Sequence, residues 1–368
     1  MSTVTADLDV LEPGRERQQS RLASAVGKNR WWITRTLMLP VHLAVFAFVV
    51  FVLVRAIPGD PVLTILGTQF TPVLYARTKL ALGLDGSFLT QLGHYYNNLI
   101  HFSLGNSIVS GRPVKTDLAT RLPATLELAL LALAAVIVFS FVASYIAVMR
   151  PTSTAGRLIR IYAKTAGAIP EFVVGLALIF IFYAELHWAP APLGRIDPLL
   201  SQPSPITNFP LLDSVLRGDW PVMISMIEHL VLPITVEVIA QSAVMIRLLI
   251  SGLEESIEAA PTRFRIASGA SRRTVTLSMY RRALPATVTM MGTLFGYLLG
   301  GAVILESLFG FTGMGQYLVD AVNSKDFISL QASLLVVGAL SLVVFLLVDL
   351  LNMLLDSRRK PGVRVEGA

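Results

Sequence analysis

The chain has 368 residues, of which 54% are hydrophobic and only 15% charged, with a mean hydropathy of +0.66; this composition excludes an ordinary soluble domain and favours a membrane protein. The net charge of +6 could indicate a nucleic-acid partner, but Lys and Arg are spread over several short stretches beside apolar runs, as membrane topology requires. The absence of cysteine excludes disulfides, thiolate catalysis and Cys-based metal sites.

Six apolar runs are long enough to cross a bilayer, which takes about 20 residues at about 1.5 Å each. They cover residues 37–57, 126–149, 168–188, 230–250, 287–309 and 334–355. The fourth run is interrupted by Glu237, Gln241 and Arg247, whereas the first, second and sixth are uninterrupted by such groups near their centres. We therefore predict an all-α polytopic membrane protein with six transmembrane helices in a domain covering 33–360.

Basic residues concentrate before the first run and after the second, fourth and sixth, and the positive-inside rule places these regions in the cytoplasm. Both termini are then cytoplasmic. Residues 1–32 are rich in polar residues and are predicted to be a disordered extension, and 361–368 a short tail. The first run follows a long polar stretch and is too long for a signal peptide, so we expect it to be retained.

The external segment 58–123 is too long for a bare connection and is expected to be folded. Ser87 can cap a helix whose apolar residues recur every three or four positions. These residues are Phe88, Leu92, Tyr95, Tyr96, Leu99 and Phe102. The helix could lie on the bilayer surface or form a platform that receives a partner, and the sequence leaves both open.

The second external segment, 190–220, contains six prolines and is predicted to be an ordered but irregular loop. The sequence has no internal repeat of two halves with broken helices, which argues against a self-contained carrier. It also lacks phosphate-binding and hydrolase motifs, and its five histidines have no metal-ligand spacing. Catalysis and metal binding are therefore not expected.

Carboxylates within the apolar runs are costly, so they usually face a bundle interior or a watery path. Glu127, Glu185, Glu306 and Asp349 lie close enough to span ends to reach water. Glu171 after Pro170, and Glu237 with Gln241 one turn on, are better candidates for lining a path. Glu306 is kept with these three as a path candidate, with contact to water at the span end as the alternative.

The fifth run carries Gly292, Gly296 and Gly300 at four-residue spacing, which lets two helices approach closely. This stripe could be static packing or a seam against a partner subunit, and its length favours the seam.

The stretch from Glu258 to Pro285 predicts two short helices. Pro261 suits the first turn of one helix, Gly269 its left-handed end, and Ser271 the cap of the next, which Pro285 is expected to close. Its arginines could simply follow the positive-inside rule. Phe264 and Ile266 beside arginine suit a knob that fits a groove on a partner, and both interpretations stay open.

Several motifs follow one another with the order and spacing of a known family. They are IPGDPV at 57–62, LGLD at 82–85, SLGNSIVSGRPV at 103–114, RLPATLELALLAL at 121–133, IPEF at 169–172, LGGAVILESLFGFTGMGQYLVDAV at 299–322 and LLVDLLNMLLD at 346–356. The sequence thereby resembles the membrane-spanning B subunit of bacterial oligopeptide/dipeptide ABC importers, from about residue 33 to 360. The resemblance implies a type I ABC importer permease fold in a bacterial inner membrane.

The resemblance also implies that 258–285 is a coupling loop that docks on an ATP-binding subunit. The family pattern places three residues between E-A-A and a glycine, whereas eight residues separate Ala260 from Gly269 here. The expected contact therefore lies nearer the glycine than the letters EAA. Its residues are Thr262, Arg263, Phe264, Arg265, Ala267, Gly269, Ser271, Arg272 and Arg273.

The other partners implied by the resemblance are a homologous C-type permease, which supplies the second half of the path, and an extracytoplasmic peptide-binding protein. Tyr95, Tyr96, Asn106 and Arg112 are the candidates for docking that protein. The chain itself would bind no cofactor and catalyse no reaction, since the ATPase partners would use ATP and Mg²⁺. The alternative is a self-contained ion-coupled carrier or channel. Related systems carry dipeptides, longer peptides, glutathione, nickel chelates or haem, and no residue separates these ligands.

Overall fold

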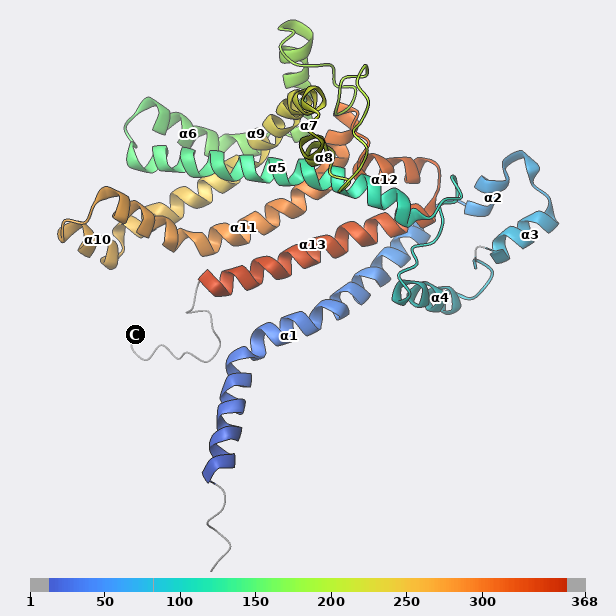
Figure 1. Cartoon of the computed structure of the whole chain (residues 1–368), viewed down its shortest axis with the longest axis horizontal. Helices are drawn as coiled ribbons and strands as arrows, with labels where there is room; N and C mark the ends of the chain where they lie inside the picture. Colours follow the sequence, from blue (N-terminus) through green and yellow to red (C-terminus); the bar gives the residue numbers. More distant parts are fainter. Residues whose placement is uncertain (1–12, 82, 356–368) are drawn as a thin grey trace, which may run out of the picture.

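The computed structural model describes residues 13–81 and 83–355, where the regular elements are helices apart from one isolated β-bridge between Asn106 and Pro113 (Figure 1). The α-helices are α1 (Pro13–Ala56), α2 (Pro61–Leu66), α3 (Pro72–Ala81), α4 (Phe88–Ile100), α5 (Val114–Met149), α6 (Thr154–Thr165), α7 (Glu171–Leu178), α8 (Pro210–Arg217), α9 (Trp220–Glu258), α10 (Ala260–Ala267), α11 (Arg272–Phe309), α12 (Met314–Asn323) and α13 (Phe327–Leu355). Short 3-10 turns cover Gly67–Gln69 and Ala166–Ala168, and a π-helical segment, Ile179–Glu185, continues α7. The prediction of an all-α polytopic protein is confirmed.

Five long apolar helices make up the body of the molecule: α1, α5, α9, α11 and α13. Helix α5 packs on α9, α9 on α11, and α13 on both α1 and α11. The short helix α10 lies at one end of this bundle and α2, α3 and α4 lie at the other (Figure 1). The centre of the bundle is dry, since Val136, Met245, Leu249 and Leu294 from three helices are almost fully buried together. The polar groups described below lie on the helices that pack around this core.

The third predicted span differs from the expected straight helix. Helix α6 and the α7 segment that follows the 3-10 turn bend by 111° and reach span length only as a pair. Ile169 is extended, as a residue before a proline prefers, so the chain breaks at Pro170. The predicted run 168–188 therefore covers only the second limb, and the described residues contain five apolar helices of span length, or six spans if the bent pair counts as one.

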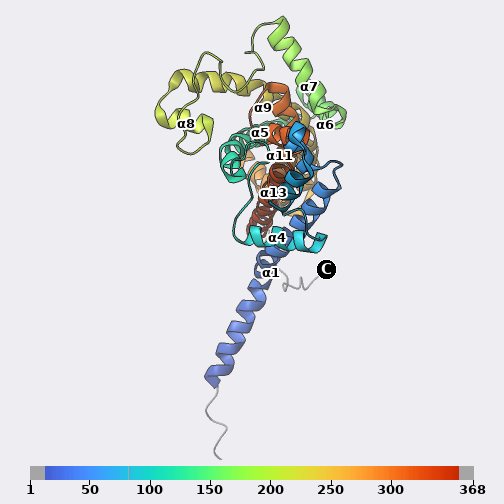
Figure 2. The ribbon, with the colours of Figure 1, turned by 90° about the vertical axis from the view of Figure 1, so that its right-hand side faces the viewer.

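Figure 2 shows where this second limb lies: α7 rises from α6 and, like α8, projects beyond the long helices. Helix α8 lies within the segment expected to be irregular throughout. Pro210 begins it because a proline in the first turn needs no backbone donor. Gly218 ends it in the left-handed conformation.

Two helix boundaries were predicted wrongly at prolines and turns. Helix α11 continues through Pro285, which was expected to end it, and reaches Phe309. Proline is tolerated inside a membrane helix where neighbouring helices pack around it, and α11 packs on α5, α9 and α13. Phe102, expected on the face of the external helix, lies beyond the end of α4 with a positive φ of 54°.

The ends of the chain lie partly outside the described residues. Residues 1–12 of the expected extension and the tail 361–368 belong to the parts that are not described. Helix α1 begins at Pro13, within the stretch expected to be disordered. The residues from 15 to 25 are mostly good helix formers, which accounts for the early start.

Candidate functional sites

The loop from Glu258 to Arg273 has the local structure that its sequence predicted. Pro261 lies in the first turn of α10, Gly269 follows that helix with φ of +76°, and the Ser271 hydroxyl accepts from the Thr274 amide to begin α11. Phe264 is 73% exposed although it is large and apolar. An exposed phenylalanine on a short surface helix is typical of an anchor for a partner protein.

The nine expected contact residues do not all reach the surface. Thr262 is fully buried and its hydroxyl has no partner among the described residues. The other eight are exposed: Arg263, Phe264, Arg265, Ala267, Gly269, Ser271, Arg272 and Arg273. The Arg265 guanidinium contacts the Ser278 hydroxyl and so ties α10 to α11. Thr262 therefore supports the loop from within, while its neighbours form the accessible surface.

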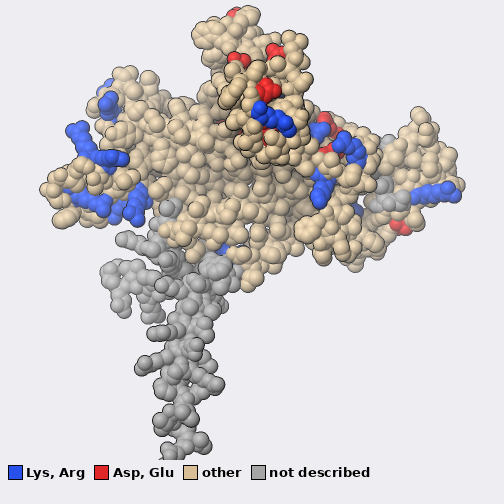
Figure 3. All heavy atoms as spheres, in the orientation of Figure 1, with Lys and Arg blue, Asp and Glu red and all other residues tan. Residues whose placement is uncertain are grey.

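A basic groove adjoins this loop. It has a volume of about 1070 Å³ and is lined by residues of α9, α10 and α11, among them Arg265, Arg273, Arg281 and Arg282. Figure 3 shows Lys and Arg gathered over α6 and α10 at this end, with a largely uncharged surface beyond them. That distribution suits a cytoplasmic face next to a hydrocarbon belt.

Three of the four path candidates come together. Glu171 begins α7, and Glu237 and Gln241 lie one turn apart on α9; the Gln241 amide donates to Glu171 Oε2 at 3.5 Å. One oxygen of each carboxyl group, Glu171 Oε1 and Glu237 Oε2, is buried without a hydrogen-bond partner among the described residues. Glu237 is 2% exposed, and Glu171 lies against Gly301 of α11, where a β-carbon would come within 3.3 Å of its carboxylate. The cluster thus joins three helices.

Glu306, the fourth candidate, lies in a different place. It is fully buried, accepts from the Thr125 hydroxyl at 2.5 Å, and also accepts from the backbone amides of Gly315 and Gln316 at 2.7 and 3.1 Å. Those two amides begin α12, so the carboxylate caps that helix. The expectation that Glu306 reaches water was wrong, because the α12 turn covers it.

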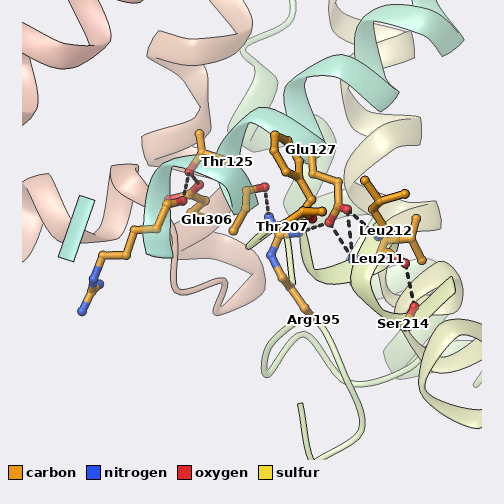
Figure 4. Close-up of polar contacts among 11 residues, drawn as sticks. Thr125, Glu127, Arg195, Thr207, Leu211, Leu212, Ser214 and Glu306 are labelled. Carbon is orange, nitrogen blue, oxygen red and sulfur yellow. Dashed lines mark hydrogen bonds and ion pairs between the residues drawn. The ribbon is translucent and has the colours of Figure 1, made fainter. Parts of the chain in front are cut away.

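Glu127 was also expected to reach water and is buried instead, in a network that the sequence did not predict (Figure 4). Its carboxylate accepts from the backbone amides of Leu211 and Leu212 at the start of α8, at 2.9 to 3.1 Å. It also lies 3.4 Å from an Arg195 nitrogen. The first turn of α8 and a guanidinium therefore supply the hydrogen bonds that the buried carboxylate requires.

Arg195 comes from the second external segment and is only 6% exposed. Besides Glu127, it donates to the Ala124 carbonyl at 2.5 Å and stacks 4.7 Å from the centre of the Phe311 ring. Burial lowers the pKa of the Arg195 guanidinium, while the charges of Glu127 and Glu306 oppose the shift. The sequence offers only a weak signal for it, since segment 190–220 contains just two basic residues, Arg195 and Arg217.

Asp213 organises the same external segment. Its carboxylate is 2% exposed and accepts from the Thr207 amide and hydroxyl and from the amides of Ile206 and Asn208, at 2.6 to 3.2 Å. Burial by itself would raise the pKa of Asp213, but these hydrogen bonds outweigh it and hold the pKa below its ordinary value. The loop is irregular yet tightly bonded.

In the first external segment, the aromatic residues of helix α4 face the chain's own helix α1. Helix α4 begins at Ser87 as predicted, with the Ser87 hydroxyl accepting from the Thr90 amide. Tyr95 packs against the Phe51 ring of α1 at 5.3 Å, and the Tyr96 hydroxyl donates to the Ala44 carbonyl at 2.7 Å. The face therefore packs on α1.

Of the four docking candidates, Tyr95 and Tyr96 thus contact the chain's own first helix. Asn106 and Arg112 are exposed, on a turn closed by the bridge from Asn106 to Pro113. The Arg112 side chain is 64% exposed and lies 3.7 Å from Asp117. The turn, and not the aromatic face, is the accessible part of this set.

The glycine stripe divides in a similar way. A β-carbon at Gly292 would come within 2.8 Å of Val348 on α13, and one at Gly296 within 3.5 Å of Phe345. Gly300 has nothing within 4 Å. Gly292 and Gly296 therefore serve contacts within the chain, which leaves Gly300 as the position open to a partner.

In the part of the chain that the structure describes, His, Asp and Glu side chains form no group of three that could hold a metal ion. Two smaller cavities, of about 370 and 450 Å³, lie between the external end of α1 and α3, α4 and α13; both reach Arg55, Gln91 and Gln331.

The straight apolar helices, the bent helix pair and the basic end are features of a polytopic membrane protein. Residues 140–361 match the family described as binding-protein-dependent transport system inner membrane component, and residues 29–129 match the N-terminal part of such membrane components. The chain belongs to this family, and it is accordingly a multi-pass inner-membrane protein.

Similar proteins include a probable D,D-dipeptide transport system permease of Escherichia coli K12, 32% identical over 311 residues, which are 84% of this chain and 91% of that protein. A di/tripeptide transport system permease of Pseudomonas aeruginosa is 33% identical over 324 residues, 88% of this chain and 96% of its own length. A dipeptide transport system permease of Escherichia coli K12 is 30% identical over 327 residues, with coverage of 88% and 96%.

Proposed function

We propose that this chain is a permease subunit of an ATP-binding-cassette importer for di- or oligopeptides. The substrate class is supported by the relatives, which are named as peptide transport system permeases. A homologous C-type permease would supply the second half of the translocation path. Gly300, on the fifth span with nothing within 4 Å, supports a close helix contact with that partner.

The observation that carries the coupling part of the proposal is the surface of α10. Phe264 and Ile266 are 73% and 53% exposed beside a groove lined with arginines. ATP-binding subunits, two copies or one fused chain, would dock there and use ATP and Mg²⁺. The permease itself would bind neither and would catalyse no reaction. This orientation requires both termini to be cytoplasmic.

The mechanism proposed is alternating access. An extracytoplasmic binding protein delivers the peptide to the external turn around Asn106 and Arg112, and ATP-driven closure of the partners moves the coupling loop. Swinging such an equilibrium from one side to the other takes about 5.5 kcal/mol of differential binding. Glu171, Glu237 and Gln241 are the polar groups best placed to line the path, because they join α7, α9 and α11 in mid-bundle.

The experiment is affinity purification of this chain from a strain that expresses the complete system, followed by ligand screening of the reconstituted complex. We expect ATPase subunits to copurify, and a peptide-loaded binding protein to stimulate ATP hydrolysis more than one loaded with glutathione, a nickel chelate or haem. A chain that purifies alone and transports ligand in response to an ion gradient would establish the carrier alternative instead.

A further inference from the structure

Arg195 and its partners form a buried polar network that none of the proposed roles uses. The network has two halves (Figure 4). In one, Arg195 from the external loop contacts Glu127 and the Ala124 carbonyl of α5, and Glu127 holds the first turn of α8. A buried ion pair is stable only when its two groups are well placed. Replacing one of them leaves the other charge buried without a partner.

The other half begins at the next residue of α5, Thr125. The Thr125 hydroxyl donates to Glu306 of α11 and accepts from the Met314 amide at 2.8 Å. Glu306 in turn accepts from the amides that begin α12. Ala124, Thr125 and Glu127 are neighbours on α5, so the external loop, α8, α11 and α12 are bonded to one stretch of that helix.

Helix α11 connects this network to the cytoplasmic loop. It runs without interruption from Arg272 to Phe309, with Ser271 as its cap at one end and Glu306 in its last turn at the other. At about 1.5 Å per residue these ends are roughly 50 Å apart. Helix α11 therefore links the loop at Gly269 to the network at Glu306, with Pro285 inside it.

The external loop, residues 186–209, is hydrogen-bonded to two helices and exposes two large apolar side chains. The Gly194 amide donates to the Phe309 carbonyl at 3.0 Å and the Asp197 amide to the Ser225 hydroxyl at 2.9 Å, so the loop is held on α11 and α9. Yet Leu193 and Leu199 are 71% and 93% exposed. Exposed leucines on a loop that hydrogen bonds hold in place are typical of a surface that contacts a partner.

We propose that Arg195 is a positioning residue that couples contacts on the external loop 186–209 to movement of α11. The partner on that loop is the binding protein of the proposed function, on which this inference rests. Contact with the loaded binding protein then favours one placement of Arg195, and through Glu127, Thr125 and Glu306 one placement of α11. By linkage, ATP-driven movement of α11 changes the affinity of the loop for the binding protein to the same degree.

The test is Arg195→Met in the complete complex, reconstituted in lipid nanodiscs and assayed for ATP hydrolysis with and without peptide-loaded binding protein. The matched control is Arg217→Met: this exposed arginine of α8 donates to the Ser204 carbonyl of the same loop at 2.7 Å, but among the described residues it is not bonded to Glu127 or α11. We expect R195M to reduce binding-protein stimulation at least about fivefold, the lower end of typical coupling, with basal hydrolysis unchanged. R217M should keep both.

A role in stability alone would lower basal and stimulated hydrolysis together and is a result that overturns the proposal, as is R195M with normal stimulation. If R195M does not assemble, Arg195→Lys decides, since it keeps the charge but loses the two-pronged contact; normal stimulation in R195K contradicts the proposal. Absence of stimulation in the unmodified complex would instead refute the proposed function.

A probe on the loop gives a second readout. The chain has no cysteine, so Leu199→Cys takes a single spin label without further changes. We expect the label's mobility to change on nucleotide binding in the parent complex and to stay constant in R195M. A label that responds equally in both would contradict the coupling.

Discussion

At the scale of single residues, the buried charges are held by backbone amides more than by opposite charges. Glu306 and Glu127 each accept from two amides at the start of a helix, and Asp213 accepts from three amides and a hydroxyl. Such hydrogen bonds favour the ionised carboxylate and fix the segments that donate them. The external loops gain order in this way without regular structure.

Asp213 makes this order dependent on pH. Its pKa is below the ordinary value in the folded loop, so the stabilisation is fully present above the unfolded pKa of about 3.9 and is lost as the pH falls through the folded value. Hydrogen exchange of the amides of Thr207 and Asn208 should accelerate in acid relative to that of the bundle core. In Asp213→Asn the two amides should exchange fast at neutral pH also; slow exchange in the variant would contradict the role assigned to the carboxylate.

At the scale of elements, the glycines of the fifth span differ in what they contact: Gly292 and Gly296 pack within the chain, and Gly300 is open to a partner. Gly292→Ala should destabilise the isolated permease by about 1–3 kcal/mol, because the new methyl group meets Val348 at 2.8 Å. Gly300→Ala meets nothing in the chain. It should leave thermal unfolding of the chain unchanged or slightly raised and weaken its copurification with the partner permease.

That pattern distinguishes the two uses of the stripe. If the Gly300→Ala variant assembles with the partner permease as well as the parent does, the proposed seam is contradicted, and the stripe serves only static packing within the chain.

Helix α10 provides the prediction on coupling. Phe264→Ala should weaken assembly with the ATP-binding subunit by about 2 kcal/mol, close to thirtyfold, as expected for a buried aromatic anchor of an interface. Leu158→Ala on α6 is the matched control, since Leu158 is also apolar and 60% exposed. Native gel or mass-photometry titrations measure both, and equal affinities for the two variants would contradict the assignment.

The elements that could be predicted from the sequence are those that local chemistry determines. Ser87, Ser271 and Gly269 act at the ends of helices because a hydroxyl or a missing β-carbon decides the conformation there. Five of the six spans follow from apolar length alone. Pro285 was misjudged because the packing of neighbouring helices outweighs the local cost of a proline.

The site was less predictable, because its contacts join distant parts of the chain. The contact between Arg195 and Glu127 is 68 residues apart in sequence, and that between Thr125 and Glu306 is 181. One signal was visible: carboxylates in apolar runs require partners, and Arg195 is one of few cations in its segment. The first limb of the bent span was missed because α6 carries three basic residues and does not read as apolar.

At the scale of the whole molecule, the charged groups divide the chain into a basic end at α6 and α10, an apolar middle and a folded external end (Figures 1 and 3). Helix α11 spans all three. The family relationship and this division suit a subunit that moves within a complex and depends on ATPase partners for energy.

The most direct test of this account is uptake of labelled dipeptide into sealed membrane vesicles that hold the reconstituted complex and enclosed ATP, with the binding protein outside. We expect ATP-dependent accumulation that stops when the binding protein is omitted, or when Phe264 is replaced by alanine. Uptake by the permease alone, driven by an ion gradient and insensitive to ATP, would contradict the account.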